Sequence, residues 1–218
     1  MIATISSDIV SSTSLSKEDI IRLKERIDEL WRILEKKYPG FWGRQIKGDY
    51  LECVIPNRAD ALRIALIIKS ALKFFQTDNN DARLFQSYGA RISIGFGDIR
   101  TVDRNDDIMD GEAIYLSGRR LEQMNQLSKG TLEVTCSSKK IEYILHPLFT
   151  LVDVIMNDAT SKQCEVLYYK LFNKNETEIA DLLNIKQSAV NQRSTGGKWY
   201  AIETALNFIE NLNWQDYE

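Results

Sequence analysis

The spacing of hydrophobic residues predicts a mixture of helices and strands over the first part of the chain. Apolar residues recur every three or four positions in three segments, as in amphipathic helices: 17–37, 57–75 and 113–126. Short β-prone runs predict five strands: 2–5, 41–46, 50–55, 90–96 and 131–136. This order favours an α+β, ferredoxin-like fold, with a mixed sheet that carries its helices on one face.

The pattern changes after Ser137. Residues 139–156 read as an irregular bridge, with a short helix and a strand candidate at 148–156. From Thr160 onward the chain reads as helix throughout. We therefore predict a mixed α/β domain over residues 1–156 and a small all-α domain over residues 157–218.

The helical tail has the spacing of a helix-turn-helix. Such a motif needs a small residue where two helices cross, a turn residue four positions later, and an apolar anchor six positions beyond. Ala180, Asn184 and Val190 meet this requirement. A generic helical hairpin is the alternative.

The third helix of the tail, predicted over residues 186–194, carries polar and basic residues that face outward or nearly so. Asn and Gln can pair with adenine, and Arg with guanine, in the major groove of DNA. The candidate DNA-binding residues are Lys186, Gln187, Ser188, Asn191, Gln192, Arg193 and Lys198. Arg193 and Lys198 would contact phosphates.

Composition narrows the classes of protein. A net charge of -3 gives no global attraction to nucleic acid, so DNA binding requires a local basic patch. The single histidine, His146, argues against a histidine-based metal site or a Ser-His-Asp triad. Three cysteines without a CxxC spacing indicate reduced thiols. With no signal peptide and no long apolar run, we expect a cytoplasmic protein without a membrane segment.

Two aspartates stand where predicted strands meet turns. Asp8 follows the first strand and Asp49 lies in the hairpin. If the fold brings them together, paired carboxylates could hold Mg²⁺ or Mn²⁺ and, through it, a nucleoside triphosphate. The alternative is structural: Asp8 caps the first helix and Asp49 belongs to the turn.

Four segments in order resemble the class III nucleotidyl cyclases: Asp8-Ile9-Val10, Gly48-Asp49, residues 91–99 and residues 111–119. The resemblance covers about residues 1–136. It implies a cyclase-type sheet, metal ligation by Asp8, Ile9 and Asp49, and a homodimer, because the family's active site forms between two domains.

The same resemblance shows where this sequence departs from the family. Gln45, Ile108 and Tyr115 occupy the positions that read the base and orient the ribose, and none is the family's usual residue. Arg119 retains the residue that neutralises the transferring phosphoryl group. Asp106, Asp107 and Asp110 could supply base contacts, or could form an ordinary solvated loop.

The whole arrangement also resembles the SatD family of bacterial proteins, which implies a soluble regulator and settles neither reaction nor ligand. We favour a dimeric DNA-binding transcriptional regulator whose degenerate cyclase-like domain dimerises and senses a nucleotide. One alternative is a metal-dependent nucleotidyl cyclase, a lyase that releases pyrophosphate. Another is a protein-interaction module that does not contact DNA.

Overall fold

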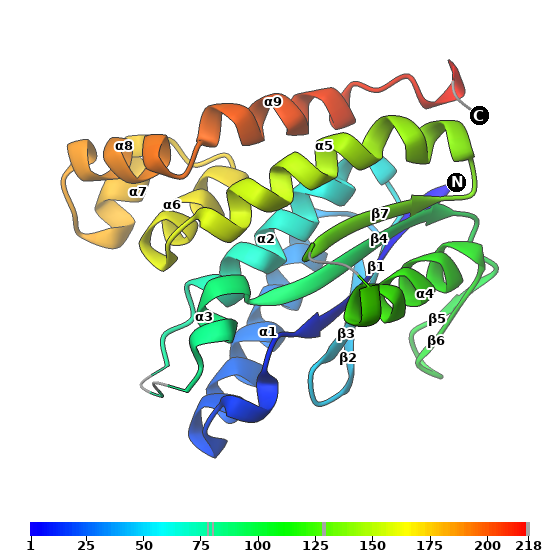
Figure 1. The fold of residues 1–218 in the computed structure, drawn as a ribbon, viewed down its shortest axis with the longest axis horizontal. Coiled ribbons are helices and arrows are strands. Elements are labelled where there is room, and N and C mark those ends of the chain that lie inside the picture. Colours follow the sequence, from blue (N-terminus) through cyan, green and yellow to red (C-terminus); the bar gives the residue numbers. More distant parts are fainter. Residues whose placement is uncertain (78, 80, 128–129, 217–218) are drawn as a thin grey trace.

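The computed structural model describes residues 1–77, 79, 81–127 and 130–216. Within them, the main sheet has five strands in the order β2-β3-β1-β4-β7 (Figure 1). The strands are β1 (Ile2–Ile9), β2 (Trp42–Lys47), β3 (Tyr50–Ile55), β4 (Ala90–Gly97) and β7 (Leu132–Cys136). The first four pair antiparallel in the ferredoxin-like order, and β7 adds a parallel edge to β4. The predicted mixed α+β architecture is confirmed.

Two long helices cover one face of this sheet. Helix α1 (Lys17–Lys37) begins at Ser16, whose hydroxyl accepts a hydrogen bond from the Asp19 amide, and α2 spans Ala61–Lys73. Gly43 of β2 lies on this face, because a Cβ there would lie 2.7 Å from the Trp31 ring of α1. The apolar residues that recur along both helices are therefore the ones that face the sheet.

Helix α4 (Glu112–Leu127) lies on the opposite face, so the prediction of helices on one face only is wrong. A Cβ on Gly95 of β4 would lie 2.4 Å from the carbonyl oxygen of Ala113 in α4. The Ser117 hydroxyl of α4 bonds to Thr4 and Ser6 of β1, at 3.1 and 2.8 Å. Because side chains alternate along a strand, these residues face away from α1 and α2. Their hydroxyls form a buried polar contact between α4 and the sheet.

The predicted irregular bridge is a single helix, α5 (Lys139–Asp158), with Pro147 inside it. A proline costs an interior helix one backbone hydrogen bond. The cost is offset by a buried stripe along one side of the helix: Ile141, Leu145, Phe149, Val152 and Met156. The strand candidate at residues 148–156 is therefore wrong, because these apolar residues follow a helical repeat.

Smaller elements complete the sheet domain. Helix α3 spans Arg83–Tyr88, and a two-stranded hairpin joins β5 (Thr101–Asp103) to β6 (Ile108–Asp110). The hairpin falls where the sequence suggested an acidic loop. Four helices follow α5: α6 (Ser161–Leu171), α7 (Glu176–Leu183), α8 (Gln187–Gly196) and α9 (Trp199–Glu210).

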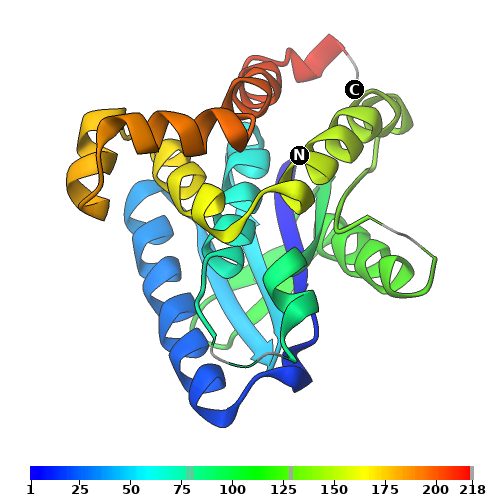
Figure 2. The same cartoon turned by 60° about the vertical axis from the view of Figure 1, so that its left-hand side comes forward.

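The hydrophobic core of the sheet continues into the tail. Cys164 and Leu167 of α6, and Leu206 of α9, belong to the same cluster of buried residues as the sheet and α2. Figure 2 shows α6 beside α2. Arg63 of α2 reaches α9 as well, with its Nε 2.6 Å from Glu210 Oε1. The proposed boundary at 156/157 falls inside α5, and the division into two domains stays a prediction. Among the described helices, none has the length and apolar character needed to cross a membrane.

Candidate functional site

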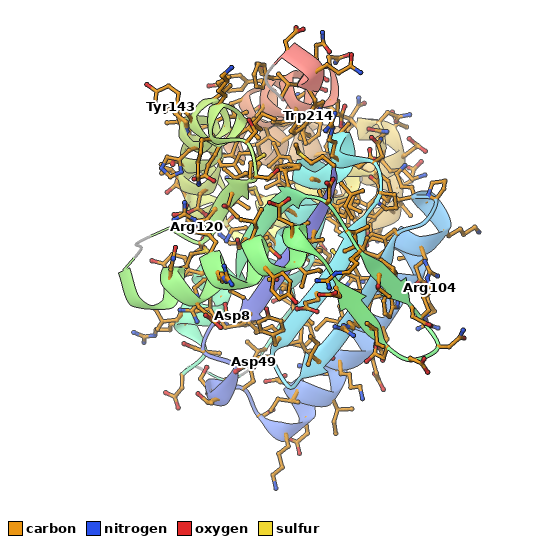
Figure 3. The ribbon with its side chains drawn as sticks, turned by 90° about the vertical axis from the view of Figure 1, so that its right-hand side faces the viewer. Asp8, Asp49, Arg104, Arg120, Tyr143 and Trp214 are labelled. Atoms are coloured by element: carbon orange, nitrogen blue, oxygen red, sulfur yellow. The ribbon has the colours of Figure 1, made fainter. Side chains whose placement is uncertain are left out.

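Asp8 and Asp49 lie at the same end of the sheet (Figure 3). Asp8 pairs in register with Tyr50, and the amide of Ile9 donates to the Asp49 carbonyl oxygen at 3.0 Å. The hairpin turn thus packs beside the end of β1. Within the chain, the two predicted metal-binding segments are neighbours.

Their carboxylates are nevertheless committed to other partners. Both oxygens of Asp8 accept from the Arg91 guanidinium, at 2.9 and 2.5 Å, and the Asp8 side chain is only 14% exposed. The Asp49 carboxylate accepts from the Ser12 hydroxyl at 2.7 Å. Asp8 lies on the same side of β1 as Ser6, which faces α4, whereas Asp49 and Ile9 line a cavity beside α1.

This arrangement does not fit Mg²⁺ or Mn²⁺, which take several oxygen ligands around one point. Asp8 is paired with a bidentate arginine, and in the described part of the chain no group of three or more acidic, histidine or cysteine side chains is arranged so that it could hold a metal ion. Sequence reasoning missed the role of Arg91. Its position opposite Asp8 follows from the antiparallel register of β1 and β4, which local sequence does not reveal.

The cavity beside α1 has a volume of about 310 Å³. Its apolar wall includes Ile9, Leu15 and Leu23, while Asp49 and Gln45 supply polar atoms. The side-chain amide of Gln45 donates to the Gly48 carbonyl oxygen, and its side-chain oxygen is buried without a hydrogen-bond partner among the described residues. Gln45 and Asp49 therefore both line this cavity, and the role of Gln45 in binding stays a prediction.

The other cyclase-like positions lie elsewhere. Tyr115 and Arg119 project from the exposed side of α4, where the Arg119 guanidinium lies 5.9 Å from the centre of the Tyr115 ring. The Tyr115 hydroxyl donates to Asp110 at 2.7 Å, and this bond raises the pKa of Tyr115. Ile108 is exposed on β6. Within one chain, Gln45 is thus separated from Ile108, Tyr115 and Arg119 by the sheet.

The acidic hairpin is tied down by arginines. Asp107 pairs with Arg44 at 3.2 Å, and Asp110 pairs with Arg100 at 2.9 Å. In this structure these two carboxylates therefore form ion pairs that stabilise the hairpin.

A second candidate surface lies on α8, at the end of the molecule farthest from the β5–β6 hairpin (Figure 1). Six of the seven predicted DNA-binding residues are exposed: Lys186, Gln187, Ser188, Asn191, Gln192 and Lys198. Behind them, Val190 of α8 is buried with Ile179 and Ala180 of α7 and with Val166 of α6. The helix is thus held by a small core of its own.

Arg193 is less exposed than the other predicted DNA-binding residues. It is half-buried, and its guanidinium lies 3.3 Å from Glu165 of α6. Position 193 follows the inward-facing Val190 by less than one helical turn, which rotates Arg193 toward α6. Arg193 therefore braces α8 against α6.

Comparisons with known proteins give little beyond the architecture. No family model matches the chain, and no curated protein matches it. Among solved structures, the chain is similar to a bacterial light-regulated adenylyl cyclase, with a TM-score of 0.47 and 19% identity over 62% of this chain and 74% of that chain. A likeness this distant carries no argument about function. The resemblance to the SatD family stays a prediction.

Proposed function

We propose that the protein is a DNA-binding regulator that contacts duplex DNA through α8. One observation carries the proposal: α7, a left-handed turn residue and α8 form a braced pair of helices whose outer face is polar. Asn184 adopts the left-handed conformation with φ of 50°, and its amide donates back to the last turn of α7. A tight turn between two helices is compatible with a helix-turn-helix and supports the proposal.

The outer face of α8 has chemistry suited to a DNA groove. Gln187 and Asn191 project from successive turns, and a side-chain amide can bond two atoms of an adenine edge; for Asn191 this requires exchange of its bond to Glu176. Lys186 and Lys198 mark the two ends of the helix and could pair with phosphates. The helix itself contains no acidic residue.

The surrounding charge makes the expected binding moderate and salt-dependent. Glu176 of α7 lies beside α8, where its carboxylate accepts from the Asn191 side-chain amide at 3.3 Å, and it is paired with Lys170 at 3.7 Å. Glu178 of the same helix is paired with Lys174 at 2.9 Å. Pairing reduces their repulsion of phosphate. With few basic residues on α8, the electrostatic contribution falls steeply as salt rises.

The test begins with selection of bound sequences from a randomised duplex pool, using the full chain at low salt. Fluorescence anisotropy then measures affinity for the selected and an unrelated duplex. Removing a base-contacting side chain costs about 1–3 kcal/mol of discrimination. We expect Gln187→Ala and Asn191→Ala to weaken selected-duplex binding by about 10–100-fold, and Lys186→Ala to weaken binding to both duplexes.

Gln86→Ala is the matched control, because Gln86 is exposed on α3 and far along the chain from α8. It should leave both affinities unchanged. Absence of duplex binding at low salt, or equal effects of the α8 variants and the control, would refute the proposal.

A second candidate function is nucleotide binding without turnover in the cavity beside α1. The polar side chains of Gln45 and Asp49 in the cavity wall support it, because amide and carboxylate oxygens can accept from the exocyclic amino group of a base. A volume of about 310 Å³ accommodates a base and its ribose. Each nucleoside triphosphate, added alone, should be screened for a rise in melting temperature. Gln45→Leu should abolish any such rise, and no rise with any nucleotide would exclude this candidate.

A further inference from the structure

The outer side of α5 carries a row of exposed apolar residues. Tyr143, Leu151 and Val154 are 83%, 65% and 62% exposed, and the exposed Pro147 lies between them in the row. Spacings of three and four place all four residues on one side of the helix, away from the buried stripe. Tyr143 projects from the outer edge of the molecule (Figure 3). Apolar side chains gathered in this way indicate a contact surface.

Charges at the two ends of this row oppose the helix dipole. Lys139 and Lys140 lie in the first turn, where the dipole is positive, and Asp158 lies in the last turn, where it is negative. Asp158 follows Val154 by four residues and Lys140 precedes Tyr143 by three, so both belong to the same row. The acidic residue of the first turn, Glu142, accepts from the Cys136 amide of β7 and pairs with Lys139 at 3.4 Å, so Lys140 is the lysine of this turn that belongs to the row.

We propose that two copies of the chain pair antiparallel through α5, about a two-fold axis that passes the helix between Leu148 and Phe149. In this register Tyr143 packs on Val154 of the second copy, and Pro147 on Leu151. Lys140 meets Asp158 of the second copy. Every contact occurs twice, as a two-fold interface requires.

Self-complementarity argues for a second copy over a different protein. An antiparallel pair brings each lysine end to the negative end of the other helix, so that both unfavourable charge placements become favourable. The apolar centre and both flanking charges match the same row reversed. A shallow depression lined by Lys139, Lys140, Tyr143 and Ile144 is open to receive Val154.

This dimer does not depend on DNA binding or on the nucleotide cavity. Its surface lies on α5, whereas the proposed DNA contacts lie on α8. A mass measurement without DNA tests the dimer, and a binding measurement tests the regulator, so failure of one is distinguishable from failure of the other.

Sedimentation equilibrium of the full chain gives the first test. We expect a monomer–dimer equilibrium in the micromolar range, with dissociation at least about tenfold easier in Leu151→Glu. Ile21→Glu on α1 is the matched control, because Ile21 is 61% exposed and lies outside the row. A wild-type chain that stays monomeric to about 100 µM, or a dimer indifferent to Leu151→Glu, would overturn the proposal.

Charge reversal at Lys140 and Asp158 gives the sharper test. Both side chains are exposed, so these substitutions should leave folding intact. Lys140→Glu alone and Asp158→Lys alone each place like charges together twice, and each should weaken the dimer about tenfold or more. The double variant Lys140→Glu/Asp158→Lys restores opposite charges and should recover at least half of the lost association on a logarithmic scale. Additive losses in the double variant would contradict the antiparallel register.

Discussion

Truncation of Leu167 tests whether the sheet and the helical tail fold as one unit. Leu167 lies on α6, is fully buried, and belongs to the hydrophobic core that it shares with α2. Replacing leucine by alanine removes three carbon groups, which at about 0.8 kcal/mol each amounts to about 2.4 kcal/mol. The cavity left behind adds about 1 kcal/mol. We expect Leu167→Ala to lower the free energy of unfolding by about 3–4 kcal/mol.

For a chain of this size, that loss lowers the melting temperature by about 6–16 °C. Hydrogen exchange then shows where the loss is felt. Because the core is continuous, the most protected amides of β1 and β4 should lose the same free energy of opening as the amides of α6. Leu182→Ala is the control, since Leu182 of α7 is 56% exposed and should cost under about 0.5 kcal/mol.

A different pattern of exchange would refute the reasoning. If β1 and β4 keep wild-type protection while α6 to α9 open more easily, the tail is an independent unit docked on the sheet. The predicted boundary at 156/157 would then separate two units that unfold independently, contrary to what the shared core implies.

Three further predictions concern single groups. Burial lowers the pKa of Lys69 to about 7, although Asp153 at 3.9 Å raises it. Because Lys69 titrates from 10.5 in the unfolded chain, the unfolded chain binds more protons between pH 7 and 10.5, and stability rises with pH in that window. The free energy of unfolding of the wild type minus that of Lys69→Met, measured by urea titration, should therefore rise between pH 7 and 10.5. A difference that stays constant over this range would contradict the prediction. Asn184→Val should destabilise the α7–α8 turn by about 1–2 kcal/mol, and Asn184→Gly should be nearly neutral in the same assay. Thr160→Ala should cost about 1 kcal/mol by removing the capping box of α6, and a loss below about 0.3 kcal/mol would count against this role.

Local pattern predicted those elements whose signals lie within a few residues. The apolar repeat predicts α1 with its observed bounds, and the turn at Gly48 predicts the β2–β3 hairpin. The exception is α5, where Pro147 interrupts the local signal while the buried stripe continues through it. There, packing against the core outweighs local propensity.

The candidate sites show what local pattern omits. The order of strands and turns was enough to predict that Asp8 and Asp49 lie near each other. The partner of Asp8, however, depends on the register that sets Arg91 opposite it. The direction of Arg193 likewise depends on Glu165, from a helix two elements earlier. The face of the sheet that α4 covers depends on the path of the chain between β4 and β7, and short stretches of sequence carry no information about this path.

The end of α5 is fixed from outside its own sequence. Lys73 of α2 donates its buried amine to the carbonyl oxygens of Met156 and Asn157, at 2.5 and 3.1 Å. These carbonyls have no partner within a helix end, so a neighbouring helix supplies the cap. Helix α2 therefore holds the end of α5 at the point from which the chain continues into α6.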